Sequence, residues 1–161
     1  MNTKKYSFAK LIKMDLNSMY DGNVKTLNNL DENLINIVNT EAPITMNLVK
    51  ARLREAFNIG KISQKALDII EEHIKKLGFK KTDNFYDEVL WPASGIFNID
   101  YLREGYERQI YDVPYQEMKN LVDNLNLKGE ELYREILKHF GFEVLTKKAS
   151  DYLKFIEKKC K

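Results

Sequence analysis

The stretch ITMNLVKARLREAFNIGKISQKALDII, residues 44–70, decides the fold. Its apolar residues follow two helical patterns that are separated by a short turn at 58–62. Thr45 and Ser63 are suited to begin these helices, because a hydroxyl oxygen accepts a backbone N–H that the first helical turn leaves unpaired. Two helices joined by such a tight turn predict a helix-turn-helix.

The residues upstream of this stretch predict two more helices. The apolar positions in 31–42 indicate a helix with Asp31 as its N-cap, which ends before Pro43 because the residue preceding proline is disfavoured in helical geometry. Apolar residues at helical spacing in 8–19 indicate another helix, which we assign to a helical N-terminal extension, residues 1–30.

The residues downstream change from helical to strand periodicity. Gly78 closes the helix, and the segments 79–81 and 85–91 then indicate two short strands of a β-hairpin. Ile44 is expected to add a short strand beside them. We favour a pattern in which Phe79, Phe85, Val89 and Trp91 alternate toward the core. The alternative is a wing whose Lys80 and Lys81 contact a nucleic-acid backbone and whose Phe85 and Tyr86 stack on it. Three helices followed by a hairpin are the order of a winged helix, here residues 31–92.

An internal repeat is the strongest signal in the sequence. A gapless shift of 83 residues aligns Ser63 with Thr146, Phe57 with Phe140 and Ala66 with Ala149, together with most apolar positions between them. The second copy, 114–161, therefore predicts helices at 115–125, 129–140 and 146–159. It lacks a wing, since the chain ends at Lys161. Residues 93–113 are expected to be a polar linker, with an additional strand at 96–99.

Together these patterns predict a mostly α fold with a small β-hairpin, built from tandem winged helix-turn-helix-like repeats. Five segments carry a resemblance to a known family: IVNTEAPI at 37–44, LREAF at 53–57, Trp91-Pro92, Val113–Glu117 and HFGF at 139–142. They resemble the family catalogued as domain of unknown function 3320, whose members are similar to winged-helix modules near the C-terminal end of very large superfamily-one helicase-like proteins. The resemblance implies an accessory role beside a helicase or nuclease, and it carries no motor domain.

The same resemblance implies basic residues around the turn that precedes the third helix. Lys61, Lys65 and Lys148 keep this character, whereas Val144 occupies the position that matches Lys61. The net charge is only +2, from 26 basic and 24 acidic residues, so any surface for phosphate groups must be local.

The third helix and the wing supply the candidate contacts, since in a winged helix the third helix can enter a groove of DNA while the wing touches the backbone. The third helix of the second copy is the more basic, because acidic residues oppose the lysines in the first copy. The alternative is that these lysines only form a solvated helix face. The candidate nucleic-acid-binding residues are Lys61, Gln64, Lys65, Lys80, Lys81, Thr146, Lys147, Lys148 and Lys154.

Catalytic and metal-dependent functions are disfavoured by the sequence. His73 and His139 have no Cys or carboxylate at metal-ligand spacing, and Cys160 has no general base near it in the sequence, although the lysines around it could lower its pKa. We expect no enzyme activity, no cofactor and no metal. The absence of an apolar run of membrane-spanning length predicts a cytoplasmic protein without a membrane partner.

The sequence therefore predicts a non-catalytic module that binds the backbone of DNA or RNA, or assists a helicase or nuclease. A protein-interaction module that uses the same helix surfaces is the alternative.

Overall fold

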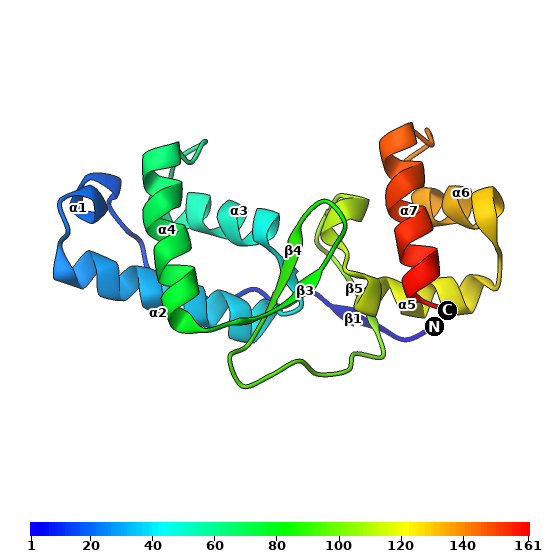
Figure 1. Ribbon diagram of the computed structural model, residues 1–161, viewed down its shortest axis with the longest axis horizontal. Coiled ribbons are helices and arrows are strands. Elements are labelled where there is room, and N and C mark those ends of the chain that lie inside the picture. The colour runs from blue at the N-terminus through cyan, green and yellow to red at the C-terminus, as the bar shows by residue number, and fades with distance from the viewer. The chain divides into compact units, whose positions relative to one another are not determined.

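The computed structural model describes residues 1–161 and is rich in α-helix, with a few short strands (Figure 1). The helices are α1 (Leu16–Tyr20), α2 (Val24–Glu41), α3 (Met46–Phe57), α4 (Gln64–Leu77), α5 (Tyr115–Leu125), α6 (Gly129–His139) and α7 (Lys147–Lys159), and a 3-10 turn covers Ile110–Asp112. The strands are β1 (Thr3–Lys5), β2 (Ile44–Thr45), β3 (Lys80–Asp83), β4 (Glu88–Trp91) and β5 (Leu102–Glu104).

The chain forms two compact units, and neither is continuous in sequence. The N-terminal unit comprises residues 7–82 and 90–96, and the C-terminal unit comprises 1–6, 83–89 and 97–161. The tip of the hairpin thus belongs to the C-terminal unit. The predicted boundaries at 30, 92 and 113 do not correspond to this division.

The N-terminal unit is built on α2, α3 and α4 (Figure 1). Thr45 and Ser63 accept hydrogen bonds from Leu48 and Ala66 as predicted, and Gly78 ends α4 in the left-handed conformation. The buried side chains that line the three helices include Leu34, Ile37, Leu53, Ile70 and Ile74. These contacts confirm most of the predicted apolar faces, but Ile35, predicted to lie on the apolar face of α2, is 38% exposed.

A three-stranded sheet in the order β2-β4-β3 follows these helices, which confirms the predicted hairpin and the short strand at Ile44. Trp91 is fully buried, and its indole N–H donates to Thr82 Oγ1 at 2.9 Å. Phe79 and Val89 are also buried. The expectation that Phe85 alternates into the core is wrong, because its side chain lies in the turn and is 47% exposed.

The first predicted helix, 8–19, is wrong for most of its length. Only Leu16–Tyr20 is helical, while residues 7–14 are not, because buried side chains of α2 and α3 bind the backbone of this segment. Asn33 accepts from the Ile12 N–H at 2.8 Å and donates to the Ile12 carbonyl at 2.9 Å. Glu41 accepts from the Ala9 N–H at 3.1 Å, and Arg52 donates to the Ala9 carbonyl at 2.8 Å.

Helix α2 begins earlier than predicted. Asn23, not Asp31, is its N-cap and accepts from the Thr26 N–H. The Asp31 carboxylate contacts α4 instead, with Oδ1 2.6 Å from His73 Nδ1 and Oδ2 2.9 Å from Lys76 Nζ. These contacts lower the pKa of Asp31 despite its partial burial.

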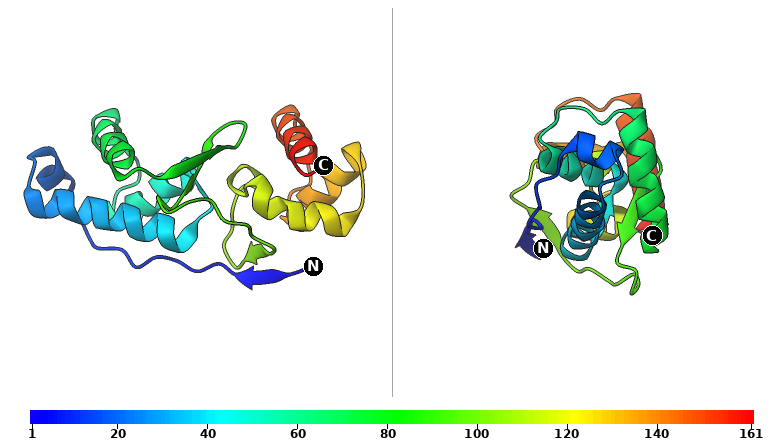
Figure 2. Two further views of the ribbon diagram at one scale, coloured as in Figure 1. Left: turned by 60° about the horizontal axis from the view of Figure 1, so that its bottom comes forward. Right: turned by 90° about the vertical axis from the view of Figure 1, so that its left-hand side faces the viewer.

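The C-terminal unit packs α5, α6 and α7 around a core that includes Met118, Ile136 and Leu153. Its three helices confirm the predicted ranges to within a residue at each end. The parallel strands β1 and β5 pair beside them, with Thr3 opposite Leu102 (Figure 2). Residues 93–113 are therefore not simply a polar linker, and the expected strand at 96–99 does not form.

The 83-residue repeat recurs in backbone geometry. Asn58 and its equivalent Gly141 both have positive φ, at 54° and 82°. Ile59 N donates to Arg54 O at 3.0 Å, and Phe142 N donates to Leu137 O at 2.8 Å, so the two bonds occupy matched positions. Thr146 accepts from the Ala149 N–H just as Ser63 accepts from Ala66.

Candidate nucleic-acid interface

Four of the predicted contact residues lie on or at the start of α7. Thr146 caps the helix, Lys147 and Lys148 occupy its first turn, and Lys154 lies two turns beyond Lys147 on the same side. All four are exposed. They are therefore brought together, as the sequence predicts.

The lysines of α7 differ in their surroundings. Lys147 Nζ donates to Asp151 Oδ2 at 2.9 Å, and this hydrogen bond and the aspartate charge raise the pKa of Lys147. The ion pair offsets much of the charge that Lys147 presents to solvent. Lys154 has no such partner.

Lys148 lies over two tyrosine rings. Its ammonium is 4.4 Å from the centroid of Tyr111 and 5.3 Å from that of Tyr86. The Tyr86 hydroxyl donates to the Lys148 carbonyl at 3.1 Å. A cation–π contact orients the ammonium but leaves its full positive charge in place, so Lys148 remains a strong candidate for phosphate contact.

The hairpin tip is held on the C-terminal unit by the buried side chain of Asn84. Its amide donates to the Tyr111 carbonyl at 2.8 Å, and its side-chain oxygen accepts from the Tyr152 hydroxyl at 3.1 Å. The Tyr152 hydroxyl also lies 2.9 Å from the Val113 carbonyl. Burial raises the pKa of Tyr152 far above its ordinary value, so this hydroxyl keeps its proton and remains a donor.

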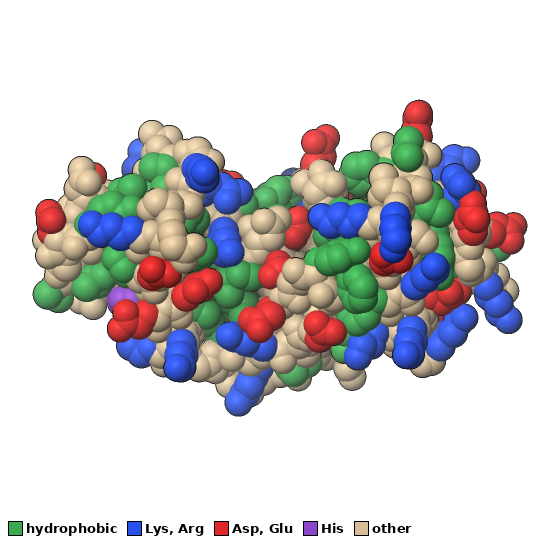
Figure 3. All heavy atoms as spheres, turned by 45° about the horizontal axis from the view of Figure 1, so that its top comes forward, with side chains coloured by type: hydrophobic (Ala, Val, Ile, Leu, Met, Phe, Trp, Pro, Cys, Tyr) green, Lys and Arg blue, Asp and Glu red, His purple; other side chains and the backbone are tan.

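Aromatic rings surround this tip. Phe85 contacts Tyr86 and Phe155, at centroid distances of 4.6 and 5.4 Å. Further along α7, Lys159 lies 5.6 Å from the Tyr115 centroid and 5.7 Å from that of Phe155. In the space-filling view, Lys and Arg side chains lie among hydrophobic ones over α7 (Figure 3). We define the α7 surface as the aromatic residues around the hairpin tip and α7 together with two lysines of α7: Phe85, Tyr86, Tyr111, Tyr115, Lys148, Phe155 and Lys159.

Sequence reasoning missed most of the aromatic part of this surface. Tyr111 and Tyr115 flank the end of the predicted linker, and Phe155 follows the helical period of α7 as an ordinary apolar residue. Only the aromatic pair Phe85-Tyr86 in the predicted hairpin gave a signal. The position of that pair against α7 depends on Asn84, which no pattern identifies.

The predicted contact residues of the N-terminal unit show a related but weaker arrangement. Lys65, the equivalent of Lys148, lies 4.3 Å from the Tyr20 centroid, and the Tyr20 hydroxyl is 2.9 Å from Ser63 Oγ. Gln64 donates to Asp68 at 2.7 Å, at the positions that match Lys147 and Asp151. Lys61 is exposed beside this helix start, and Lys80 and Lys81 are exposed on β3.

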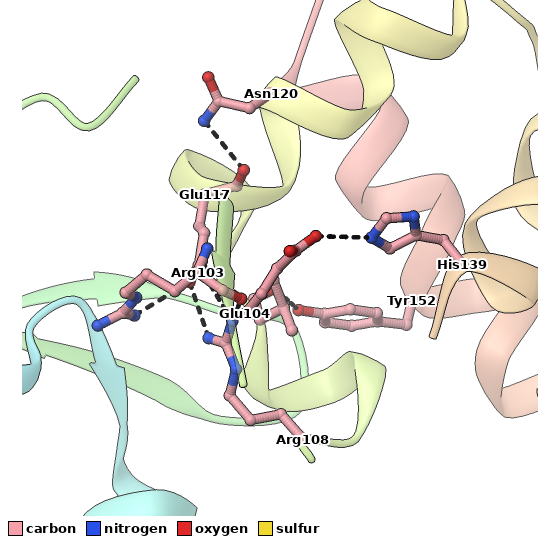
Figure 4. Close-up of polar contacts among 8 residues, drawn as sticks. Arg103, Glu104, Arg108, Glu117, Asn120, His139 and Tyr152 are labelled. Atoms are coloured by element: carbon pink, nitrogen blue, oxygen red, sulfur yellow. Dashed lines mark hydrogen bonds and ion pairs between the residues drawn. The ribbon is translucent and has the colours of Figure 1, made fainter. Parts of the chain in front are cut away.

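Beneath β5, a buried cluster of charges fixes the geometry of the C-terminal unit (Figure 4). Arg108 donates to both oxygens of Glu117, at 2.8 and 2.6 Å, and Arg103 donates to Oε2 at 3.0 Å. The Tyr6 ring lies 4.7 Å from the Arg103 guanidinium carbon and 5.3 Å from that of Arg108. All three charged side chains are almost fully buried, so the cluster holds structure. Arg103 and Arg108 also line a pocket together with His139 and Phe142.

His139 and Cys160 are two further reactive side chains of the C-terminal unit. His139 Nε2 is 3.8 Å from Glu104 Oε1, which is too long for a hydrogen bond (Figure 4). Burial raises the pKa of Cys160 to about 11, although the sequence suggested that nearby lysines could lower it. No group of three or more His, Cys, Asp or Glu side chains is arranged to hold a metal ion.

Comparison of the chain with protein families, with curated proteins and with solved structures found no match. None of the helices combines the length and the apolar character needed to cross a membrane.

Proposed function

We propose that the chain is a non-catalytic nucleic-acid-binding module with two winged-helix-like repeats, in which α4 and α7 are the third helices. The matched caps, turns and positive φ values at an offset of 83 residues support the repeat. A role beside a helicase or nuclease belongs to the same proposal and rests on the resemblance of the sequence alone.

The observation that carries the proposal is the exposed basic start of α7. A phosphate backbone is bound mainly through Lys and Arg, with release of counterions. Helix α7 carries five lysines and two acidic residues, a local net charge of 5 − 2 = +3 in a chain whose total is +2. Because Asp151 offsets Lys147, we assign the larger share of phosphate contact to Lys148 and Lys154.

A protein-interaction module is the second candidate function. It is favoured by exposed apolar side chains beside the same helix, above all Val144, which is 70% exposed at the position matching Lys61. An interface of this kind buries an apolar centre and depends little on salt.

Fluorescence anisotropy with labelled DNA and RNA at two salt concentrations tests the proposal. The double variant Lys148→Glu/Lys154→Glu should weaken binding and reduce the salt slope by about one unit for each phosphate that is no longer neutralised. Lys65→Glu at the matched position of α4 is the control and should have a smaller effect, because Asp68, Glu71 and Glu72 follow it on the same helix. Melting temperatures should barely change, since these lysines are exposed.

Absence of binding at low salt to single-stranded and double-stranded DNA and RNA would refute the nucleic-acid function. The protein-interaction function would then take its place.

A further inference from the structure

We propose that the α7 surface binds single-stranded nucleic acid, with unpaired bases stacking on Phe85 and Tyr86 and the backbone phosphates meeting Lys148 and Lys159. This inference rests on the proposed function and specifies its ligand. Proteins that bind single strands combine aromatic platforms with a basic track, because every base has a π-face and every nucleotide a phosphate.

The first argument is exposure. Phe85 and Tyr86 are 47% and 45% exposed, although both contact other aromatic rings. Phe85 contacts Phe155 at its flank and Tyr86 contacts Tyr111, at a centroid distance of 5.7 Å. Tyr86 is also stacked against Tyr152 at 6.2 Å, with the Lys148 ammonium 5.3 Å from its centroid. The rings are therefore held by their neighbours, while nearly half of the accessible area of each residue remains open to solvent.

The second argument is the backbone of the turn. Phe85 has φ of 64°, a left-handed conformation that is uncommon for a bulky residue and is ordinarily occupied by glycine or asparagine. The Phe85 N–H donates to Asp83 Oδ1 at 3.2 Å, and the Tyr86 N–H donates to Asn84 O at 2.8 Å, so the turn is fixed. A strained conformation that presents an aromatic ring to water contributes little to a core. Such strain is characteristic of binding sites.

The third argument is pre-organisation. Buried Asn84 and Tyr152 hold the turn, and the Tyr86 hydroxyl is bonded to the Lys148 carbonyl. Rings that are already ordered lose little conformational entropy when a ligand binds. The platform is thus built before the ligand arrives.

The fourth argument is charge and its spacing. Lys148 and Lys159 lie on the same side of α7, three helical turns apart, and each has its ammonium within 6 Å of aromatic centroids of the surface. Glu157, the acidic residue nearest to Lys159 in sequence, is already occupied by the Gly129 N–H and the Tyr133 hydroxyl. The hairpin itself contributes the carboxylates of Asp83, Asp87 and Glu88, so the positive charge that complements a polyanion comes from α7.

The exposed rings of the α7 surface favour a single-stranded ligand over a duplex. In a duplex the base faces are stacked on one another and the bases present only their edges, so an exposed ring finds no partner there. Stacking on Phe85 and Tyr86 requires an unpaired base.

The test measures the affinity of the full chain for a labelled oligothymidylate and for a duplex of equal length by fluorescence anisotropy. Phe85→Leu keeps an apolar side chain in the same strained turn but removes the π-face. We expect it to weaken single-strand binding by about tenfold or more and to leave duplex binding unchanged. Phe97→Leu, which alters an exposed aromatic ring elsewhere in the C-terminal unit, is the matched control and should change neither affinity.

Phe85→Gly separates binding from folding. Glycine adopts positive φ without strain, so this variant should keep the melting temperature of the wild type while it loses single-strand affinity. Equal affinity of wild type and Phe85→Leu for the oligothymidylate would refute the stacking proposal and leave the proposed function standing. Failure of the wild type to bind either probe would overturn both, and binding to polyglutamate alone would show that the surface takes an acidic protein instead.

Discussion

At the scale of single residues, Glu117 is the most constrained group of the protein. Its burial opposes ionisation, but the hydrogen bonds and charges of Arg108 and Arg103 outweigh that effect and lower its pKa. The carboxylate also accepts from the Arg103 backbone N–H at 2.8 Å, which ties α5 to β5. A single carboxylate therefore pairs with two guanidinium groups and positions a strand.

Replacement of Glu117 by Gln should be strongly destabilising. The variant removes the carboxylate charge that pairs with both buried guanidinium groups, and the loss of one partner from a buried ion pair costs about 3–5 kcal/mol. Urea denaturation of wild type and variant measures the difference. Glu130→Gln is the control, because Glu130 pairs with Arg134 on the surface and its loss should cost less than about 1 kcal/mol. Equal effects of the two substitutions would contradict the role assigned to the cluster.

The wild type and Glu117→Gln should also differ in how their stability depends on pH. The pKa of Glu117 is lower in the folded chain than its ordinary value of 4.5, so its contribution is present above about pH 4.5 and is lost as the pH falls toward the folded-state pKa. The free energies of unfolding of wild type and Glu117→Gln should therefore differ most near pH 7 and converge in acid. Denaturation measured at intervals from pH 7 to about pH 3 tests this. A difference in the free energy of unfolding that does not change with pH would show that ionisation of Glu117 is not its cause.

At the scale of elements, the sequence predicts helices well but predicts poorly the side-chain hydrogen bonds that hold distant backbone segments in place. Thr45, Ser63 and Gly78 mark helix ends through local chemistry, and each lies where the pattern predicts. The segment 7–14 fails because its hydrogen bonds come from residues remote in sequence, such as Asn33. For the same reason the basic half of the candidate site could be predicted from the residues of α7, whereas its aromatic half could not.

Loss of the two hydrogen bonds that Asn33 makes with the Ile12 backbone should make the segment 7–14 more mobile. Asn33→Ala removes both hydrogen bonds to Ile12 and leaves its backbone groups without these partners, a change that costs about 1–3 kcal/mol. Hydrogen exchange should then become faster at the Ile12 amide. Asn28→Ala, at an exposed position of the same helix, should leave this rate unchanged. An unchanged hydrogen-exchange rate at the Ile12 amide in Asn33→Ala would show that these hydrogen bonds are not needed to hold the segment.

At the scale of the whole molecule, neither unit can be excised by a single cut. The C-terminal unit needs residues 1–6 and 83–89 in addition to 97–161. Asn84 is the clearest example, since it satisfies the Tyr111 carbonyl and contacts the Tyr152 hydroxyl from a separate segment of the chain.

Fragments of the chain make this prediction measurable. Both fragments lack residues 1–6, but residues 79–161 retain the hairpin and should unfold at a higher temperature than residues 97–161, which lack Asn84. Circular dichroism during heating compares the two. Asn84→Ala in the longer fragment should abolish most of the difference, because it removes the central polar contact. Identical melting of both fragments would show that the hairpin tip adds nothing to the C-terminal unit.

The pairing of β1 with β5 also constrains the order in which the chain folds during its synthesis. A ribosome releases Thr3–Lys5 first, but the partner strand, Leu102–Glu104, emerges only after the whole N-terminal unit has been made. During translation β1 therefore waits unpaired, and pairing between positions so distant in sequence is slow. Docking of β1, and with it the contact of Tyr6 with Arg103 and Arg108, therefore follows synthesis of the N-terminal unit.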